Sequence, residues 1–289
     1  MLEVFLTVSI AYILKRLGLF SEEHSKVLVN YVLYFALPLL SFKTAHSIGL
    51  SKEVAFIGVG AWLVIALCIL TSYLVGKALK LKKSDLRTLM MASAFGNTAF
   101  LGYPYSFTYF GEEGLKYAVI YDSVGSFLAV SSVGFLIVSG NLQLRSIILF
   151  PPFLGLLFGF LLRAYELPAF FWKFVDFSIA SLLPVVLFSL GLSLEFSHVG
   201  KGLKLLATAI GIKMFLSPLF ALLVFKALPV SETAYRVSVL ESAMPTMITA
   251  SLLVLRYGLN HSLAFASAGL GILLSFLSIP AWVYILNKL

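Results

Sequence analysis

Cysteine is nearly absent from this sequence of 289 residues. The single cysteine, Cys68, lies in an apolar run and cannot form a disulfide within the chain, so it carries no information about the redox compartment. Motifs for nucleotide chemistry and serine hydrolysis are missing too: there is no Walker A motif, no glycine-rich dinucleotide fingerprint and no Gly-x-Ser-x-Gly. We therefore expect no enzyme, no catalytic residue, no cofactor and no ATP-driven transport by this chain alone.

Charged residues are also scarce, at 12 % of the chain, although the net charge is +8. The basic residues gather in the connections between apolar runs, which is typical of a membrane protein, so we expect no nucleic-acid partner. The four histidines fall near the ends of apolar runs. None of them has a second histidine, a cysteine or a carboxylate at metal-ligand spacing, so we expect no metal site.

Apolar residues, in contrast, make up 60 % of the chain, and the mean hydropathy is +1.01. Runs of about 20 apolar residues, the length that crosses a bilayer, recur along the whole sequence. The ten expected spans are 1–18, 24–43, 54–76, 86–110, 115–138, 146–165, 168–195, 203–226, 232–256 and 262–286. The sequence therefore predicts an all-α membrane protein that crosses the cytoplasmic membrane ten times and is surrounded by lipid.

The distribution of charge in the connections predicts the orientation. The third connection holds five cations, whereas the fourth holds Glu112 and Glu113 with Lys116. The cations of the third connection are Lys77, Lys80, Lys82, Lys83 and Arg87. By the positive-inside rule this connection is cytoplasmic. Parity then places Lys26 and Arg145 on the cytoplasmic side as well, and both termini outside.

Two pairs of motifs recur half a chain apart. Asn30-x₇-Pro38 has the same spacing as Asp176-x₇-Pro184, at an offset of 146 residues. SAFGNTAFLGYPYSFTYFG, from residue 93, is similar in the same way to SAMPTMITASLLVLRYG, from residue 242. Ten spans give five per half, and because five is odd the second half enters the membrane from the opposite side. The sequence therefore predicts a 5+5 inverted repeat, which is typical of secondary transporters.

Helix-breaking residues lie near the middle of the fourth and ninth expected spans, at Gly96-Asn97 and at Pro245. Proline removes a backbone donor and clashes with the preceding turn. Unwound backbone at this depth is tolerated where it lines a cavity or is buried in protein. The half-helix that follows each break offers free N–H groups and a positive dipole end, which suit a carboxylate. The alternative is that both positions are ordinary kinks of membrane helices.

At these residues the chain resembles the auxin efflux carrier family, which includes plant auxin exporters and bacterial carriers of malate- and malonate-type anions. The resemblance runs the whole length of the chain and rests on FALPLLSF (35–42), GNTAFLGYP (96–104), SLGLSLEF (189–196) and AMPTMITASLLVLRYG (243–258). It implies that broken helices 4 and 9 cross and bind an organic anion. It also implies a dimerising scaffold, residues 1–53 and 141–198, and a transport domain, residues 54–140 and 199–289. The substrate-binding residues expected on this basis are Asn97, Thr98, Pro104, Pro245, Thr246 and Ser41.

Three charged residues fall inside expected spans, where burying a charge is costly and usually functional: Asp122, Lys213 and Glu241. One interpretation makes them a proton or cation relay, with Lys213 paired to Asp122 or Glu241. The other makes Asp122 a structural hydrogen-bond acceptor and lets Lys213 extend along the helix to the membrane surface. Both interpretations stay open here, while Asp176 is assigned a structural role.

The sequence thus predicts a homodimeric secondary carrier of a small organic anion, auxin-like or a dicarboxylate, which works by elevator-type alternating access. Two alternatives remain. A Na⁺-coupled symporter of the bile-acid-carrier type would have a similar fold. A membrane receptor without transport would be expected to carry an effector domain or a long regulatory loop, and this sequence shows neither.

Overall fold

The computed structural model of the protein describes residues 2–48, 51–140, 151–194 and 202–289. These ranges hold almost only helices, and their one β feature is an isolated bridge between two residues. An apolar chain in lipid must satisfy its backbone hydrogen bonds internally, and the helix does so within each segment. The expected domain boundaries near 141 and 198, and Arg145, lie outside the described residues.

The first half contains helical elements that follow one another with few breaks. They are α1 (Leu2–Arg16), α2 (Glu22–Tyr31), η1 (Val32–Ala36), α3 (Leu37–Ile48), α4 (Lys52–Ala78), α5 (Lys83–Ala94), η2 (Thr98–Gly102), α6 (Tyr103–Ile120), η3 (Tyr121–Ser126), α7 (Phe127–Ala129), η4 (Val130–Gly134) and α8 (Phe135–Ser139). The η elements are short π-helical stretches inside longer helices.

The described residues of the second half are also almost entirely helical. Its elements are α10 (Pro151–Leu161), α11 (Ala169–Ala180), α12 (Leu182–Ser193), α13 (Leu203–Gly211), η5 (Ile212–Leu216), α14 (Ser217–Lys226), α15 (Glu232–Ser242), α16 (Ile248–Arg256) and α17 (His261–Leu286). The broken helices of the two halves begin 149 residues apart, at Lys83 and at Glu232.

Six helical segments of the described chain are long and apolar enough to cross a membrane. They are Glu23–Ser47, Lys52–Ala78, Thr98–Ser139, Ala169–Ser193, Leu203–Lys226 and His261–Leu286. This confirms the all-α, multi-pass part of the expected fold. The other expected spans are shorter or divided: α1 has 15 residues, the described part of the sixth span is the 11-residue α10, and α5, α15 and α16 are pieces of broken helices. The ten-span arrangement therefore stays a prediction.

The segment Thr98–Ser139 is itself divided at Gly111. This glycine has φ 65° and ψ −154°, a conformation that side-chain-bearing residues rarely adopt. The helix axis changes there, one residue after the predicted end of the fourth span at 110. The longest apolar segment thus consists of two helices that meet at Gly111.

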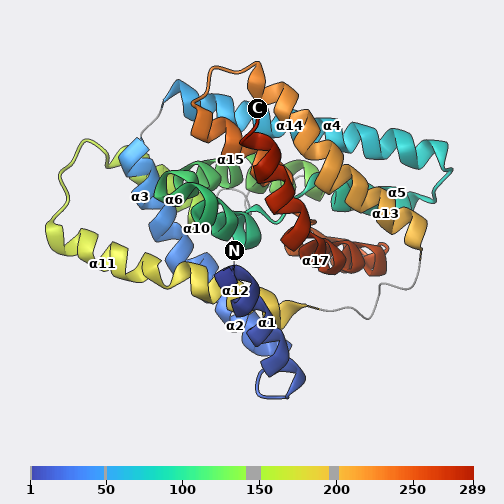
Figure 1. Ribbon diagram of the computed structural model, residues 1–289, viewed down its shortest axis with the longest axis horizontal. Helices are drawn as coiled ribbons and strands as arrows, with labels where there is room; N and C mark the ends of the chain where they lie inside the picture. The colour runs from blue at the N-terminus through green and yellow to red at the C-terminus, as the bar shows by residue number, and fades with distance from the viewer. Residues whose placement is uncertain (1, 49–50, 141–150, 195–201) are drawn as a thin grey trace.

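The helices form two contact groups (Figure 1). In one, α12 packs against α1 and α2, and α3 packs against α10; Figure 1 shows α1, α2 and α12 together at the lower edge of the molecule. In the other, α4, α5, α13, α14, α15, α16 and α17 pack on one another. An ion pair between Lys43 and Asp176, with Nζ and Oδ1 2.6 Å apart, joins α3 to α11. Asp176 therefore has the structural partner that its assigned role requires.

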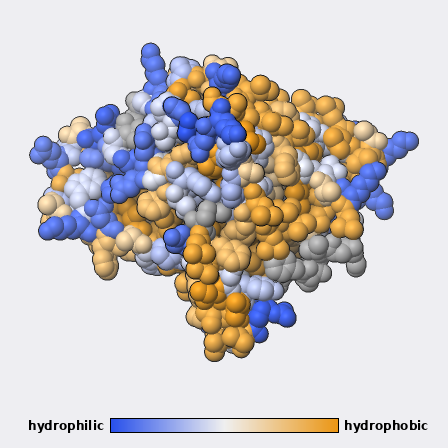
Figure 2. Space-filling model, in the orientation of Figure 1, coloured by the Kyte–Doolittle hydropathy of each residue, from blue (hydrophilic) through white to orange (hydrophobic). Residues whose placement is uncertain are grey.

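The surface agrees with a membrane location. Figure 2 shows broad apolar areas over the helices, with hydrophilic residues gathered mainly at the left, upper and right edges of this face. Large apolar side chains that are more than two-thirds exposed include Phe177, Leu277, Leu223 and Phe170. A soluble monomer rarely exposes so much contiguous apolar area, whereas lipid solvates it.

Gly102, at the junction of η2 and α6, supports the packing of these helices and yields a stability prediction. The carboxylate of Glu241 lies so close to the Gly102 Cα that an added Cβ would overlap with it. Overpacking of this kind costs about 1–3 kcal/mol. We expect Gly102→Ala to lower the melting temperature of the detergent-purified protein, measured by size-exclusion chromatography after heating.

The matched control is Gly211→Ala in α13. A Cβ at Gly211 would meet no atom within 4 Å, and alanine is the better helix former, so this variant should melt no lower than the native protein. Equal melting temperatures for the two variants would contradict the close packing of Glu241 on Gly102.

Candidate functional site

Two broken helices, α5–η2 and α15–α16, meet at their breaks. We call this contact the crossing. The backbone between α5 and η2 contacts the backbone between α15 and α16 in an antiparallel bridge of Gly96 with Thr246. The N–H of Asn97 donates to the carbonyl of Pro245 at 2.7 Å, and the N–H of Met247 donates to the carbonyl of Phe95 at 2.9 Å. Each break therefore satisfies one backbone donor and one backbone acceptor of the other. The structure brings together three residues that the sequence predicts as a site, Asn97, Pro245 and Thr246.

The hydroxyl groups at the breaks are used within the protein. Thr246 donates to the carbonyl of Ala92, at 2.7 Å, in the last turn of α5. Thr98 donates to Asp122 Oδ1 at 2.5 Å, and Tyr103 donates to Asp122 Oδ2 at 2.9 Å. Asp122 is buried and thereby ties the start of the η2–α6 helix to η3. These contacts fix the position of the two breaks.

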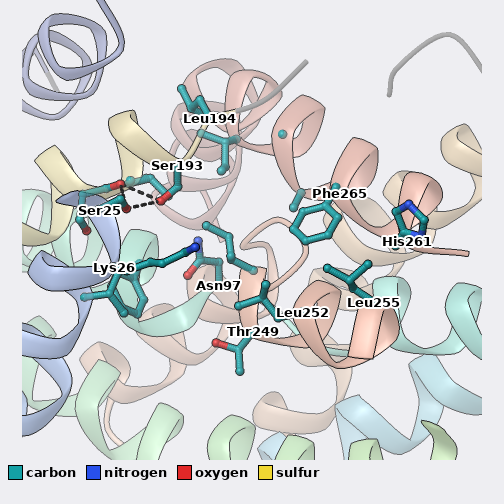
Figure 3. Close-up of a pocket in the computed structure, with 18 of the residues that line it drawn as sticks. Ser25, Lys26, Asn97, Ser193, Leu194, Thr249, Leu252, Leu255, His261 and Phe265 are labelled. Atoms are coloured by element: carbon teal, nitrogen blue, oxygen red, sulfur yellow. Dashed lines mark hydrogen bonds between the residues drawn. The ribbon is translucent and has the colours of Figure 1, made fainter. Parts of the chain in front are cut away.

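A cavity of about 600 Å³ lies beside the crossing (Figure 3). It is lined from α2 and α12 on one side, from α16 and α17 on the other, and by Asn97 and Phe100. Of the predicted substrate residues, Asn97 lines it. Thr98, Pro104, Pro245 and Thr246 are buried without lining it, and Ser41 is buried in α3.

Asn97 has the environment of a ligand-binding amide. Its side chain is 2 % exposed, and its Nδ2 atom has no hydrogen-bond partner in the part of the chain that the structure describes. A buried donor without a partner costs free energy, on the order of 1–3 kcal/mol, that a ligand acceptor would recover. The Nδ2 group therefore marks the position at which a ligand oxygen would bind.

Two helix N-termini reach the cavity near Asn97. Ile248 and Thr249, the first residues of α16, line it, and so does Phe100 in the first turn of the η2–α6 helix. The first intrahelical donors of these helices are Ser251, bonded to Met247, and Leu101, bonded to Asn97. The N–H groups before them belong to the positive ends of two helix dipoles, which favour an anion.

Several polar residues of the cavity were not predicted from the sequence. Lys26 and Asn30 line it from α2, Ser189 and Ser193 from α12. Figure 3 shows the Lys26 side chain extending toward Asn97. None of the described residues that line the cavity is acidic. A signal was available, because Lys26 and Asn30 are four residues apart on one helix face and Asn30 belongs to the repeated motif.

Lys213 lies on another side of the crossing. It is 2 % exposed, and its Nζ donates to the carbonyl of Ser242 at 2.5 Å and to Ser217 Oγ at 3.3 Å. A Cβ on Gly96 would lie 2.8 Å from Lys213 Cε, so the side chain touches both breaks. The ammonium thus caps the carbonyl end of α15, the negative end of its dipole. The alternative in which Lys213 extends to the membrane surface is wrong.

The expected pairing of Lys213 is also absent: within the described ranges it forms no ion pair with Asp122 or Glu241. Glu241 accepts a hydrogen bond from Ser106 Oγ at 2.7 Å through Oε1, and its buried Oε2 has no partner among the described residues. Three ionisable side chains therefore surround the crossing, each held by neutral groups, and none of them lines the cavity.

The fold and this site define a multi-pass membrane protein with a ligand cavity at the contact of two broken helices. The model of the membrane transport protein family matches the chain over residues 1–143 and 139–283. The chain therefore belongs to this family, and the resemblance to auxin efflux carriers is confirmed.

Two relatives are described as uncharacterized transporters. One, from Methanothermobacter thermautotrophicus, is 29 % identical over 99 % of this chain and 97 % of its own length. The other, from Methanocaldococcus jannaschii, is 32 % identical over 98 % of this chain and 96 % of its own length.

Lys213→Met tests whether the buried ammonium serves transport or stability. A buried ammonium that has no ion pair loses much of its hydration, and this cost offsets the hydrogen bond that Lys213 donates to Ser242, so removing the charge while keeping the aliphatic volume should change the melting temperature little. We expect transport in proteoliposomes to fall at least tenfold, because the cap of α15 at the crossing is lost.

Lys204→Met, at the exposed second residue of α13, is the control and should transport normally. A Lys213→Met protein that melts earlier but, where folded, transports at the native rate would make Lys213 a structural residue.

Proposed function

We propose that the protein is a secondary carrier of a small organic anion, and that the anion's carboxylate binds to Asn97 in the cavity beside the crossing. The unpartnered, buried Nδ2 of Asn97 is the observation that carries this proposal. The two helix N-termini and Lys26 add positive potential, and none of the described side chains that line the cavity is acidic. A carboxylate accepts from all of these donors at once.

The cavity wall favours an anion with an apolar body. Beyond the polar group around Asn97, it consists largely of aliphatic and aromatic side chains: Phe100, Leu190, Ile248, Leu252, Leu255, Phe265 and Ile272. A second carboxylate would lie largely against this apolar surface, where His261 is the polar side chain beside Leu255 and Phe265, and it would lose most of its hydration. Between the two predicted substrate classes we therefore propose an auxin-like monocarboxylate over a dicarboxylate.

We also propose the 5+5 inverted repeat and the elevator mechanism. Broken helices that begin 149 residues apart and meet in an antiparallel bridge support an inverted relation between the halves. The cavity lies between the proposed scaffold, through α2 and α12, and the proposed transport domain, through Asn97, α16 and α17. A substrate held there contacts both, as alternating access requires. Homodimerisation through the scaffold and external termini belong to the same proposal.

The two alternatives, a Na⁺ symporter and a receptor without transport, would require different features at the crossing. A Na⁺ symporter would need carbonyl and carboxylate ligands free at the breaks. The carbonyl of Ser242 accepts from Lys213 and both Asp122 oxygens accept from hydroxyls, whereas Glu241 Oε2 has no partner among the described residues. Flux measured with and without an imposed Na⁺ gradient distinguishes the Na⁺ symporter from the proposed carrier. A receptor without transport would bind the anion but move none across a proteoliposome membrane.

Asn97→Ala is the direct test of the substrate site. Losing one charge-assisted hydrogen bond costs about 1.5–3 kcal/mol, or roughly 10- to 150-fold in affinity. We expect this loss in calorimetric titrations with arylacetates and alkyl carboxylates, with the protein still folded. Asn287→Ala, which removes an exposed amide bonded to Arg236, should bind normally. An Asn97→Ala protein with native affinity for every anion of the panel would refute the assignment.

Lys26→Met tests the contribution of charge from α2. The variant should bind the carboxylate about tenfold more weakly, which is about 1.4 kcal/mol. It should bind the neutral primary amide of the same acid as well as the native protein does, because the amide has no charge to lose. Lys52→Met, an exposed cation at the start of α4, serves as control. Equal losses for acid and amide would mean that Lys26 shapes the cavity and does not neutralise the substrate.

A further inference from the structure

A second hollow, of about 520 Å³, lies far from the crossing, where the end of α4, the start of α5 and α8 meet. Three cations line it: Lys77, Lys83 and Arg87. The remaining lining is apolar or aromatic: Tyr73, Leu81, Leu86, Met90, Leu136 and Ile137. None of these residues belongs to the substrate cavity, and no acidic side chain is among the described residues that line the hollow.

The cations converge from two helices. Lys77 is in the last turn of α4, and its Nζ lies 5.6 Å from the centre of the Tyr73 ring. Lys83 begins α5, and Arg87 follows one turn later on the same face, where like charges repel each other. Arg87 donates to the carbonyl of Val138 at 3.4 Å, which holds it beside α8. An anion between the three cations would reduce their mutual repulsion.

The nearest carboxylate does not neutralise them. Asp85 lies in the same first turn of α5, but it accepts from the side-chain amide of Asn260 at 2.7 Å and is absent from the lining of the hollow. Lys83 is exposed and Arg87 is half-buried. A compact anion with several acceptor oxygens would satisfy all three cations, as a phosphate group does.

The apolar side of the hollow continues along the outer surface of the helices. Tyr73 and Leu136 are 41 % and 45 % exposed, and Leu74 and Leu70, farther along α4, are 56 % and 53 % exposed. In Figure 1 the α4–α5 connection forms the right-hand corner of the molecule, and Figure 2 shows hydrophilic residues at that corner bordered by apolar ones. The hollow thus has a basic end and an apolar wall, which together match an amphiphile.

We infer that this hollow binds an anionic phospholipid. The phosphate of the headgroup lies between Lys77, Lys83 and Arg87, and an acyl chain runs along Leu136 and Tyr73 toward Leu74. Basic pockets between membrane helices on the cytoplasmic side bind anionic headgroups in this way. The apolar wall is the reason to choose a lipid over a free phosphate ion. The bound lipid would hold α5, the helix that leads to the break at Gly96, against α4 and α8.

The test uses the full-length, detergent-purified protein with added phosphatidylglycerol, with phosphatidylcholine of the same acyl chains, with diacylglycerol and with inorganic phosphate. Native mass spectrometry counts the bound lipid, and melting temperature reports its effect. We expect a retained phosphatidylglycerol adduct and a higher melting temperature, and neither with the other three additives. Equal effects of phosphatidylcholine, or of inorganic phosphate alone, would overturn the proposal.

Two double variants separate a specific site from general surface charge. Lys77→Gln/Lys83→Gln removes two cations that line the hollow, and Lys80→Gln/Lys82→Gln removes two from the same connection that do not line it. We expect the first to reduce bound phosphatidylglycerol at least tenfold and the second to leave it unchanged. Equal reductions would overturn the proposal. Anion affinity at Asn97 should be native in both, which keeps this test independent of the proposed transport function.

Discussion

The structure depends on how two interrupted helices satisfy their backbone hydrogen bonds inside an apolar protein. Breaking a helix frees donors and acceptors that lipid cannot bind, and each such group costs several kcal/mol if it remains unpaired. Here the extended residues around Gly96 and Thr246 pair with each other, so each break satisfies the other. Neither break would be stable alone. Pairing them fixes the two helices at one point and leaves the helix ends beyond that point available for a ligand.

The helix ends at the crossing differ in their surroundings according to the sign of the helix dipole. The negative ends of α5 and α15 are capped from within the protein, since Thr246 donates to Ala92 and Lys213 donates to Ser242. The positive ends of the η2–α6 helix and α16 instead reach the cavity. One half of the chain uses a hydroxyl as its cap and the other uses an ammonium, although the two breaks are otherwise similar. The result is a crossing whose open side is positive, and this sign is the basis on which we propose an anionic substrate.

The sequence was sufficient to locate the breaks, because glycine, asparagine and proline in the middle of an apolar run all disfavour a continuous helix. Of the six substrate-binding residues that it predicted, only Asn97 lines the cavity. The sequence could not separate Asn97 from Thr98 or Thr246, since the direction of each side chain depends on the bridge between the breaks. Lys26 was missed because a lysine near the start of a span is usually interfacial, and its place in the cavity depends on how α2 packs against α12. One interpretation paired Lys213 with a carboxylate on the basis of charge alone. In the structure Lys213 instead donates to the carbonyl of Ser242 at the C-terminus of α15.

The polar residues of the cavity belong to the two different contact groups of helices. Whether their hydrogen bonds are satisfied differs between the groups, and this difference matters if one group moves against the other. On the α2–α12 side, Ser25 donates to the carbonyl of Ser189 at 2.9 Å and lies 2.6 Å from Ser193 Oγ, so these hydroxyls are satisfied without a ligand. On the crossing side, the Asn97 amide is not satisfied within the described chain. If the two contact groups of helices slide past each other, the serines keep their hydrogen bonds. The Asn97 amide moves with the crossing and still lacks an acceptor. A bound carboxylate would therefore travel with the crossing, and Lys26, anchored on α2, would be the contact that breaks. The contribution of Lys26 to anion affinity would then be part of the free energy needed to move the crossing, with its bound anion, away from α2.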